Sequence, residues 1–341
     1  MTETAASALI RSSFAWDNHA CMPLRPADTA FLPQIERARA AGFDAVTINI
    51  GFGQSGPDEH FAMLASMREW FSARAQQYRL IERPSDLDDA RAEGRLGILF
   101  DIEGACAIAD RLDLVERFYA GGVRWMLIAY NRANLAGGGC LDAEDGGLTA
   151  FGRAMIAEMN RVGMTVCCTH TGHRTAMDVL EAAQAPVIFS HSNCSAVYQH
   201  PRNIPDALIR ACAETGGVVG INGLGDFLGP RGADLDTAIV AHIDHAVSLV
   251  GPEHVGIALD YVYDREELLE YFRTHKDTLP ADMDETVPMI GPEGLTGIVE
   301  RLIGLGYPDA AIRQILGGNW RRVADACWRP VDAAVQEMTD V

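Results

Sequence analysis

Eight short apolar runs, separated by longer amphipathic segments, constrain the fold of this chain most strongly. The runs are mostly continuous rather than alternating, as is typical of parallel strands that are buried on both faces. Strands that alternate with helices predict a parallel sheet, and eight rounds favour a closed (β/α)8 TIM barrel of the α/β class. The predicted strands are residues 13–16, 45–50, 96–100, 124–129, 165–168, 187–190, 217–221 and 255–259.

The intervening segments carry helical periodicity and helix-boundary residues. We see no internal repeat or low-complexity linker, so we expect one barrel domain over residues 1–341, with a long loop at 261–291 and a C-terminal helical segment after Gly318. The loop is acidic, which fits either a substrate-access loop or a solvated surface. A second loop, 131–147, is rich in glycine. The predicted helices are residues 28–41, 57–78, 149–162, 175–184, 205–215 and 237–250.

Composition excludes several classes of function. The formal net charge is −19 and Lys276 is the only lysine, so we expect no nucleic acid partner and no membrane partner. A single lysine also leaves none for Schiff-base or carbamylated-lysine chemistry at the strand ends. The first 14 residues are too polar for a secretory signal, and the eight cysteines are expected to be reduced thiols. These features predict a cytoplasmic protein, and a homodimer is the default expectation.

Residues that bind metals or transfer protons stand at the ends of five of the runs. In a barrel the carboxyl ends of the strands meet on one face, which holds the active site. A metal centre with a proton-transfer group is therefore predicted there. Its candidate residues are His19 and Cys21 after the first run, Glu103 after the third, His170 after the fifth, His191 after the sixth and Asp260 after the eighth.

Each of these residues alone has a plain structural explanation. A single histidine at a strand end is more often a hydrogen-bonded core residue than a ligand. Glu103 could pair with an arginine, and Asp260 could cap a loop. The prediction rests on the combination, because suitable residues at five separate strand ends are hard to assign to chance. Imidazole and carboxylate ligands suit Zn2+ and other divalent transition ions.

Several motifs resemble the membrane (renal) dipeptidase family, over about residues 15 to 327. The resemblance implies a metal-dependent (β/α)8 hydrolase that cleaves dipeptides. The stretches around His191 and Gly318 are the more specific ones. The motifs are DIEG at 101–104, APVIFSHSNC at 185–194, HPRNIPD at 200–206, GGVVGIN at 216–222, HVGIALD at 254–260 and ILGGN at 315–319.

The resemblance also implies residue roles. Glu103 would bridge two ions, His170 and His191 would bind one of them, and His19 would bind the other. Arg202 would hold the carboxylate of the substrate, because a guanidinium fork suits carboxylates. Asp260 would be the acid/base that protonates the leaving amine.

Two positions depart from the family pattern. Cys21 stands where the family has an aspartate ligand; it would bind Zn2+ as a thiolate, or stay protonated and leave only one ion bound. Tyr130 stands where the family has a histidine that contacts the scissile carbonyl. It can donate a hydrogen bond there and is thus both a catalytic and a substrate-binding candidate, but it cannot become a cation.

Three functions remain open on this evidence. The first is a zinc-dependent hydrolase of a dipeptide or a small N-acyl amino acid with a free carboxylate. The second is a family member turned to a non-hydrolytic reaction, isomerisation or elimination, on a carboxylated amine, as the changes at Cys21 and Tyr130 would permit. The third is a non-catalytic binding protein, against which the set of retained site residues argues.

Overall fold

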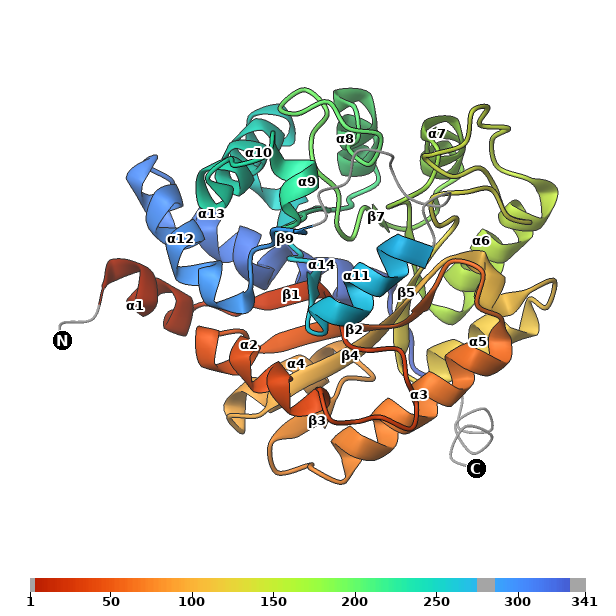
Figure 1. The fold of residues 1–341 in the computed structure, drawn as a ribbon, viewed down its shortest axis with the longest axis horizontal. Coiled ribbons are helices and arrows are strands. Elements are labelled where there is room, and N and C mark those ends of the chain that lie inside the picture. Colours follow the sequence, from red (N-terminus) through yellow and green to blue (C-terminus); the bar gives the residue numbers. More distant parts are fainter. Residues whose placement is uncertain (1–3, 275–285, 332–341) are drawn as a thin grey trace.

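The computed structural model describes residues 4–274 and 286–331, and its strands form the predicted barrel (Figure 1). A parallel sheet runs in the order β10-β1-β2-β4-β5-β6-β7, and β8 pairs with β9. A bridge between Phe189 and Val219 joins β7 to β8, and the Asp260 amide donates to His19 O at 3.0 Å beside β1. The eight barrel strands are β1 (Trp16–Cys21), β2 (Ala45–Phe52), β4 (Leu96–Glu103), β5 (Val123–Leu127), β6 (Thr165–Cys167), β7 (Val187–Ile188), β8 (Val219–Ile221) and β9 (Val255–Ile257).

The first strand was predicted at the wrong place. It begins at Trp16, where the prediction ended, so His19 and Cys21 lie within β1 rather than after it. The reason is that β1 buries polar residues that an apolar pattern does not reveal. Asp17 accepts a hydrogen bond from the Leu259 amide at 2.8 Å, and burial raises the pKa of its carboxyl to about 7.

Two short strands add to the barrel. β3 (Tyr78–Leu80) pairs with the N-terminal residues of β4, and β10 (Tyr261–Val262) extends the sheet beside β1. The predicted helix 57–78 is therefore too long, because α3 ends at Ser72 and Tyr78 already belongs to β3.

Helices surround the strands, and the main apolar core lies between the two layers (Figure 1). A second cluster that includes Trp16, Leu99, Trp125, Ile188 and Trp320 draws on successive strands and fills the barrel. The helices are α1 (Ala5–Ser12), α2 (Glu36–Ala41), α3 (Pro57–Ser72), α4 (Pro84–Ala92), α5 (Asp113–Ala120), α6 (Ala150–Val162), α7 (His173–Glu181), α8 (Asp206–Glu214), α9 (Gly225–Leu228), α10 (Leu235–Val250), α11 (Arg265–Thr274), α12 (Leu295–Gly304), α13 (Asp309–Arg313) and α14 (Asn319–Cys327).

The loop prediction for 261–291 is wrong in its first part, which contains β10 and α11. The many acidic residues of this segment indicated an irregular surface, yet the apolar side chains of α11 lie at helical spacing. Residues 275–285 of the predicted loop lie outside the described part of the chain. The glycine-rich loop 131–147 has no helix or strand, as predicted.

All eight cysteines are free thiols. In the part of the chain that the structure describes, no helix is both long and apolar enough to cross a bilayer.

Candidate metal centre

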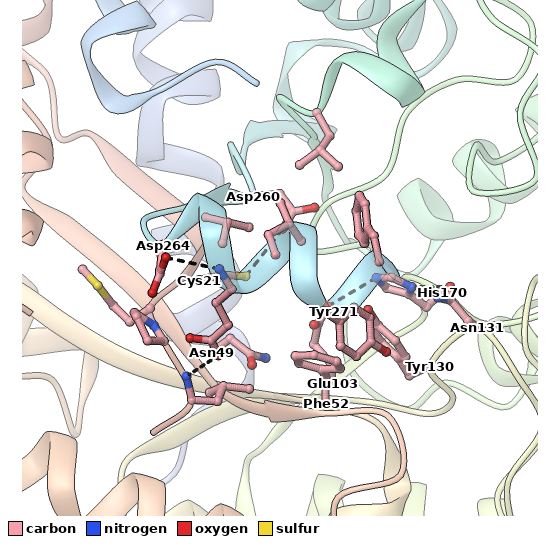
Figure 2. Close-up of a pocket in the computed structure, with 18 of the residues that line it drawn as sticks. Cys21, Asn49, Phe52, Glu103, Tyr130, Asn131, His170, Asp260, Asp264 and Tyr271 are labelled. Atoms are coloured by element: carbon pink, nitrogen blue, oxygen red, sulfur yellow. Dashed lines mark hydrogen bonds and ion pairs between the residues drawn. The ribbon is translucent and has the colours of Figure 1, made fainter. Parts of the chain in front are cut away.

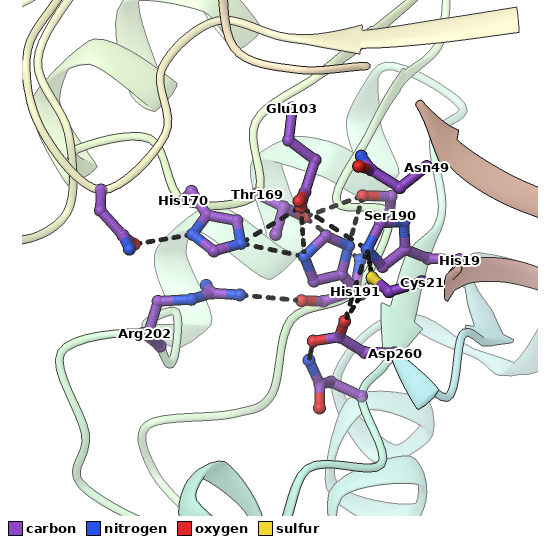
Figure 3. A network of polar contacts seen from close by, with 12 residues as sticks. His19, Cys21, Asn49, Glu103, Thr169, His170, Ser190, His191, Arg202 and Asp260 are labelled. Atoms are coloured by element: carbon purple, nitrogen blue, oxygen red, sulfur yellow. Dashed lines mark hydrogen bonds and ion pairs between the residues drawn. The ribbon is translucent and has the colours of Figure 1, made fainter. Parts of the chain in front are cut away.

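The strand-end residues converge on one carboxylate oxygen at the carboxyl face of the barrel (Figure 3). Oε1 of Glu103 lies 3.1 Å from Nε2 of His191, 3.3 Å from Nε2 of His170 and 3.6 Å from Nε2 of His19. These side chains come from β4, from the segments after β6 and β7, and from β1. The barrel therefore gathers groups that are up to 172 positions apart in the sequence, from His19 to His191.

Glu103 Oε1 is buried and has no hydrogen-bond partner. An isolated buried carboxylate is costly, and burial raises the pKa of Glu103 to about 8. A cation would offset that cost. Ligand atoms around a tetrahedral zinc ion lie roughly 3.4–3.6 Å apart, given metal–ligand distances of about 2.0–2.3 Å. The separations around Glu103 are close to that spacing, so the residues fit a divalent transition ion.

The three imidazoles are oriented by groups behind them. The Nδ1 atom of His170 donates to Asn131 Oδ1 at 2.7 Å, and Nδ1 of His19 lies 3.0 Å from Asp101 Oδ2. These acceptors require a proton on Nδ1, so each of the two rings in its neutral form presents the lone pair of Nε2 toward Glu103. Nδ1 of His191 lies 3.0 Å from the Ser190 hydroxyl. Such outer partners are common at metal sites and raise ligand basicity.

Electrostatics separates the histidines into two groups. Burial, with the positive charges of Arg202 and His19 nearby, holds the pKa of His170 well below its usual value, and burial does the same for His191. Both are therefore neutral imidazoles, the form that binds metals. Burial also acts to lower the pKa of His19, but the charges of Asp101, Cys21 and Glu103 outweigh it and raise that pKa.

A second group of ligand atoms lies beside the first. His19 Nε2 is 3.5 Å from Cys21 Sγ and 3.4 Å from Asp260 Oδ1, and the latter two atoms are 3.7 Å apart. His19, His191 and Asp260 therefore form one cluster able to hold a cation, while Glu103, His170 and His191 form another. Burial raises the pKa of Cys21 to about 12. A bound cation would reverse that preference, because a coordinated thiol is deprotonated.

Backbone strain collects at the same place. His170, Asp260 and Asn131 have φ values of 61°, 55° and 56°, in the left-handed region that non-glycine residues rarely adopt. Strain of this kind costs on the order of 1–3 kcal/mol for each residue and tends to persist at functional sites.

Arg202 and Tyr130 line the cavity over the cluster, and Figure 2 shows Tyr130 beside His170 there. The Arg202 guanidinium is buried, its Nε has no hydrogen-bond partner, and it forms no ion pair with any described residue. Within the described part of the chain, the guanidinium donates one hydrogen bond, from Nη2 to His191 O at 3.5 Å. The Tyr130 ring stacks on His170 with centroids 4.3 Å apart, and burial raises the pKa of its hydroxyl. Tyr130 is therefore a neutral hydrogen-bond donor.

Sequence reasoning missed several residues of the site. Asp101 and Asn49 support His19, since Asn49 Nδ2 donates to Asp101 Oδ1 at 2.8 Å. Asn222 Nδ2 donates to Asp260 Oδ2 at 2.7 Å. The signal was present for two of them. Asp101 shares a strand face with Glu103, and Asn222 directly follows the seventh predicted strand. The segment of helix α11, which covers the cavity, was predicted only as a loop that either shapes substrate access or forms a solvated surface.

A profile of the membrane dipeptidase family (peptidase family M19) matches residues 41–270. The match includes Glu103, His170, His191, Arg202 and Asp260, whereas His19 and Cys21 lie before it.

Relatives and solved structures agree with this match. The chain is 29% identical, over 276 residues, to an uncharacterized Klebsiella pneumoniae protein encoded in the pqqA 5′ region, a match that spans 78% of this chain and 95% of the relative. A dipeptidase of Clonostachys rogersoniana, verJ, is 34% identical over 60% of this chain and 58% of its own length. The chain thus spans less than two thirds of that named dipeptidase.

Among solved structures, an amidohydrolase from Pseudomonas aeruginosa superposes with a TM-score of 0.86 at 26% identity, over 95% of this chain and 99% of the other. A metallopeptidase from Rhodobacter sphaeroides, bound to a phosphinate mimic of the dipeptide L-Ala-D-Ala, has a TM-score of 0.76 at 21% identity, over 93% of this chain and 100% of the other, and shows the shared fold. The profile covers more than half of the chain, and the chain therefore belongs to the membrane dipeptidase family of metallopeptidases, peptidase family M19.

Proposed function

We propose that this chain is a zinc-dependent hydrolase of dipeptides or small N-acyl amino acids that carry a free carboxylate. The observation that carries the proposal is the buried, unpartnered Oε1 of Glu103 among three Nε2 atoms at 3.1–3.6 Å. In this proposal Glu103, His170 and His191 hold one ion, and Glu103, His19 and Cys21 hold a second. Zinc bound there would polarise a carbonyl and lower the pKa of a bound water.

Arg202 supplies the substrate anchor in this proposal. A buried guanidinium that no described carboxylate neutralises favours an anionic ligand, and its planar fork suits a carboxylate. The cavity beside it has a volume of about 150 Å3.

Asp260 and Tyr130 supply the proton and the hydrogen bond. Asp260 Oδ2 is held by Asn222, which leaves Oδ1 directed at His19 and Cys21. We assign Asp260 to take a proton from the attacking water and to deliver it to the leaving amine. We assign the neutral Tyr130 hydroxyl to donate to the carbonyl oxygen as it gains charge.

Two measurements test the proposal. Elemental analysis of protein purified without chelator should find zinc. If no transition metal is found even after incubation with Zn2+, the proposal is wrong and a non-catalytic binding protein remains. With metal bound, a dipeptide should be hydrolysed far faster than its C-terminal amide. Arg202→Ala should raise KM for the dipeptide strongly and leave the slow reaction of the amide unchanged. Equal turnover of acid and amide would contradict the role of Arg202.

One observation favours a second candidate, a non-hydrolytic reaction on a carboxylated amine. Tyr130 lines the cavity as a neutral hydroxyl. The resemblance to the family implies a histidine at this position, which would supply a positive charge to a tetrahedral oxyanion. If a metal-loaded preparation cleaves no dipeptide or N-acyl amino acid, but isomerises or eliminates from one of them in a reaction that Tyr130→Phe abolishes, this candidate replaces hydrolysis.

A further inference from the structure

Helix α11 presents an apolar face to the cavity over the metal centre. Leu268, Tyr271 and Phe272 follow helical spacing, and all three line the cavity. Their side chains are only half-buried although they point inward, and α11 has no fully buried residue. Leu268 and Phe272 pack in part against the cluster of Leu224, Phe227 and Val287, and Tyr271 does not, so the apolar face of the helix is covered only in part.

Phe52 continues this apolar wall to the metal centre itself. It is the last residue of β2 and pairs in register with Glu103 on β4. Its ring centroid lies 5.0 Å from that of Tyr271 in an edge-to-face contact and 5.1 Å from that of Tyr130. Figure 2 shows the three rings gathered beside Glu103. An apolar surface therefore begins beside Glu103, the residue at the centre of the metal site.

Two carboxylates near this wall share one arginine. Asp264 and Glu267 line the cavity beside α11, and both pair with Arg25, the former at 2.9 Å. Arg25 also pairs with Asp28, so the group keeps a net negative charge, which disfavours an acidic side chain of a substrate.

The position of Arg202 indicates which part of the substrate meets the wall. Its guanidinium carbon lies 5.1 Å from the ring centroid of Phe227, whereas Phe52 contacts Tyr130 and Tyr271. A carboxylate held by Arg202 places the C-terminal residue beside Phe227. The wall of Phe52 and Tyr271 then remains for the residue on the acyl side of the scissile bond.

We propose that Phe52, Tyr271 and Leu268 form a subsite for a bulky apolar side chain on the acyl-side residue of the substrate. The proposal rests on the proposed hydrolytic function and specifies its substrate class: dipeptides, or N-acyl amino acids, whose acyl half is aromatic or branched aliphatic. A leucine or phenylalanine side chain completes the apolar face of α11, and an acidic side chain lacks a partner there.

The test compares Leu-Ala, Phe-Ala, Ala-Ala, Glu-Ala and Ala-Leu as substrates of the metal-loaded protein. Binding of an apolar side chain discriminates by about 10- to 200-fold. We therefore expect kcat/KM for Leu-Ala and Phe-Ala to exceed that for Ala-Ala by at least about tenfold and that for Glu-Ala by more. Ala-Leu should gain much less. A preference set only by the C-terminal residue would overturn the proposal.

Variants separate the wall from the rest of the helix. Tyr271→Ala and Leu268→Ala should reduce the Leu-Ala to Ala-Ala ratio by about tenfold while Ala-Ala turnover persists, and Tyr271→Phe should keep the ratio because the ring remains. Glu270→Ala is the matched control, since Glu270 is exposed on the same helix and, among the described residues, forms an ion pair with exposed Arg273 alone. An unchanged ratio in both wall variants would overturn the proposal.

A binding measurement keeps this test independent of turnover. Phosphinate mimics of Leu-Ala and Ala-Ala are titrated into the metal-loaded protein, and we expect the leucine mimic to bind at least about tenfold more tightly, with the difference lost in Tyr271→Ala. If the mimics bind with this preference but no peptide is cleaved, hydrolysis fails and the subsite stands. If peptides are cleaved without any side-chain preference, the subsite fails and hydrolysis stands.

Discussion

Cys21 stands where the resemblance to the family implies an aspartate, and its position in the site makes a role in metal binding testable. Cys21 Sγ lies 3.5 Å from His19 Nε2, close to the spacing of two ligands on one zinc ion. We predict that the Co2+-substituted protein shows the near-ultraviolet thiolate-to-cobalt absorption band, and that Cys21→Ser loses the band and part of the bound metal. Cys21→Asp should lose the band but keep the metal, with peptidase activity unchanged or higher.

Cys106→Ser is the control for this measurement. Cys106 is also partly buried, but its thiol donates to Gln54 Oε1 at 4.0 Å rather than to a residue of the metal centre. A cobalt band that survives in Cys21→Ser would exclude Cys21 as a ligand. The remaining half of the site, Glu103 with His170 and His191, should then account for all the metal bound.

Asp260 and Asp264 are the two candidates for the acid/base carboxylate, and their partners differ. Asp264 pairs with Arg25 at 2.9 Å, whereas Asp260 faces His19 and Cys21. We predict that Asp260→Asn lowers kcat by roughly a hundredfold or more, the usual scale for loss of a general acid/base, with metal content unchanged. Asp264→Asn should affect kcat little. Loss of metal in Asp260→Asn would instead identify Asp260 as a ligand, and loss of activity only in Asp264→Asn would reverse the assignment.

At this scale the sequence predicted which residues meet but not what supports them. His19, Glu103, His170 and His191 end or follow strands of one barrel, so a common face was sufficient reason to expect them together. Asp101 and Asn131, which orient two of the imidazoles, act through side-chain geometry that strand periodicity does not contain. The φ of His170 likewise depends on the folded loop.

At the scale of elements, α10 is tied to the segment after β7 by one buried histidine. Nδ1 of His242 accepts from the Cys194 amide at 3.0 Å, and its Nε2 donates to Leu228 O at 3.0 Å. The bond that Nδ1 accepts requires the neutral ring, because a protonated Nδ1 has no lone pair. Burial lowers the pKa of His242 to about 4, below its ordinary value of 6.5.

The direction of the pH effect follows from these two pKa values. Between about pH 6.5 and pH 4 the unfolded chain binds a proton at His242 and the folded chain does not, so stability falls as pH falls. The loss approaches about 3 kcal/mol near pH 4, at about 1.4 kcal/mol for each unit of pKa difference. We predict that His242→Gln, which keeps an acceptor and a donor, makes the free energy of unfolding decline less steeply in this window. Urea titrations from pH 7 to pH 4.5 measure it.

His245→Gln is the control on the same helix. His245 is only partly buried and contacts Asp206 through Nε2 at 2.8 Å. Its substitution should leave the steep decline of the parent protein in place. A decline that is equally steep in His242→Gln would mean that other groups cause the acid sensitivity.

Helices with clear boundary residues were predicted best. Thr149 caps α6 by accepting from the Gly152 amide, and the predicted end at Val162 is observed. Helix α11 was missed because its charged residues outnumber its apolar ones, and the role of its apolar face is visible only over the cavity. Short strands such as β7, with two residues, are defined by pairing rather than by composition.

At the scale of the whole molecule, residues from the C-terminal part of the chain pack against the barrel beside its first and last strands. Gly317 is packed so closely that a Cβ there would lie 2.5 Å from Phe14 O, and Trp320 of α14 donates through Nε1 to Ile257 O at 3.1 Å. Eight strand–helix rounds predicted closure of the sheet, but they did not indicate that Trp320 would fill the barrel beside β8 and β9. That contact depends on glycines whose packing role is visible only in three dimensions.

Gly220 and Gly256 are those glycines, paired with each other in the register of β8 and β9. A Cβ at Gly256 would lie 2.5 Å from Trp320 Cε2, and a Cβ at Gly220 would lie 2.9 Å from its Cζ2 and 2.1 Å from Ser190 O. Gly256 is the better position for a test, because its nearest neighbours are atoms of a side chain that can itself be changed. We predict that Gly256→Ala lowers the free energy of unfolding by about 1–3 kcal/mol, the usual scale of overpacking.

Gly304→Ala is the control for Gly256→Ala, since a Cβ at Gly304 near the end of α12 meets open space. It should be neutral or slightly stabilising, because alanine favours the helix. A double-mutant cycle then isolates the cause. If the indole excludes a side chain from β9, Gly256→Ala should cost much less in a Trp320→Leu background, and the two changes should be non-additive by at least about 0.5 kcal/mol. Additive costs, measured by denaturant unfolding, would show that the strand backbone rather than Trp320 requires glycine, and that α14 does not determine how β8 and β9 close the barrel.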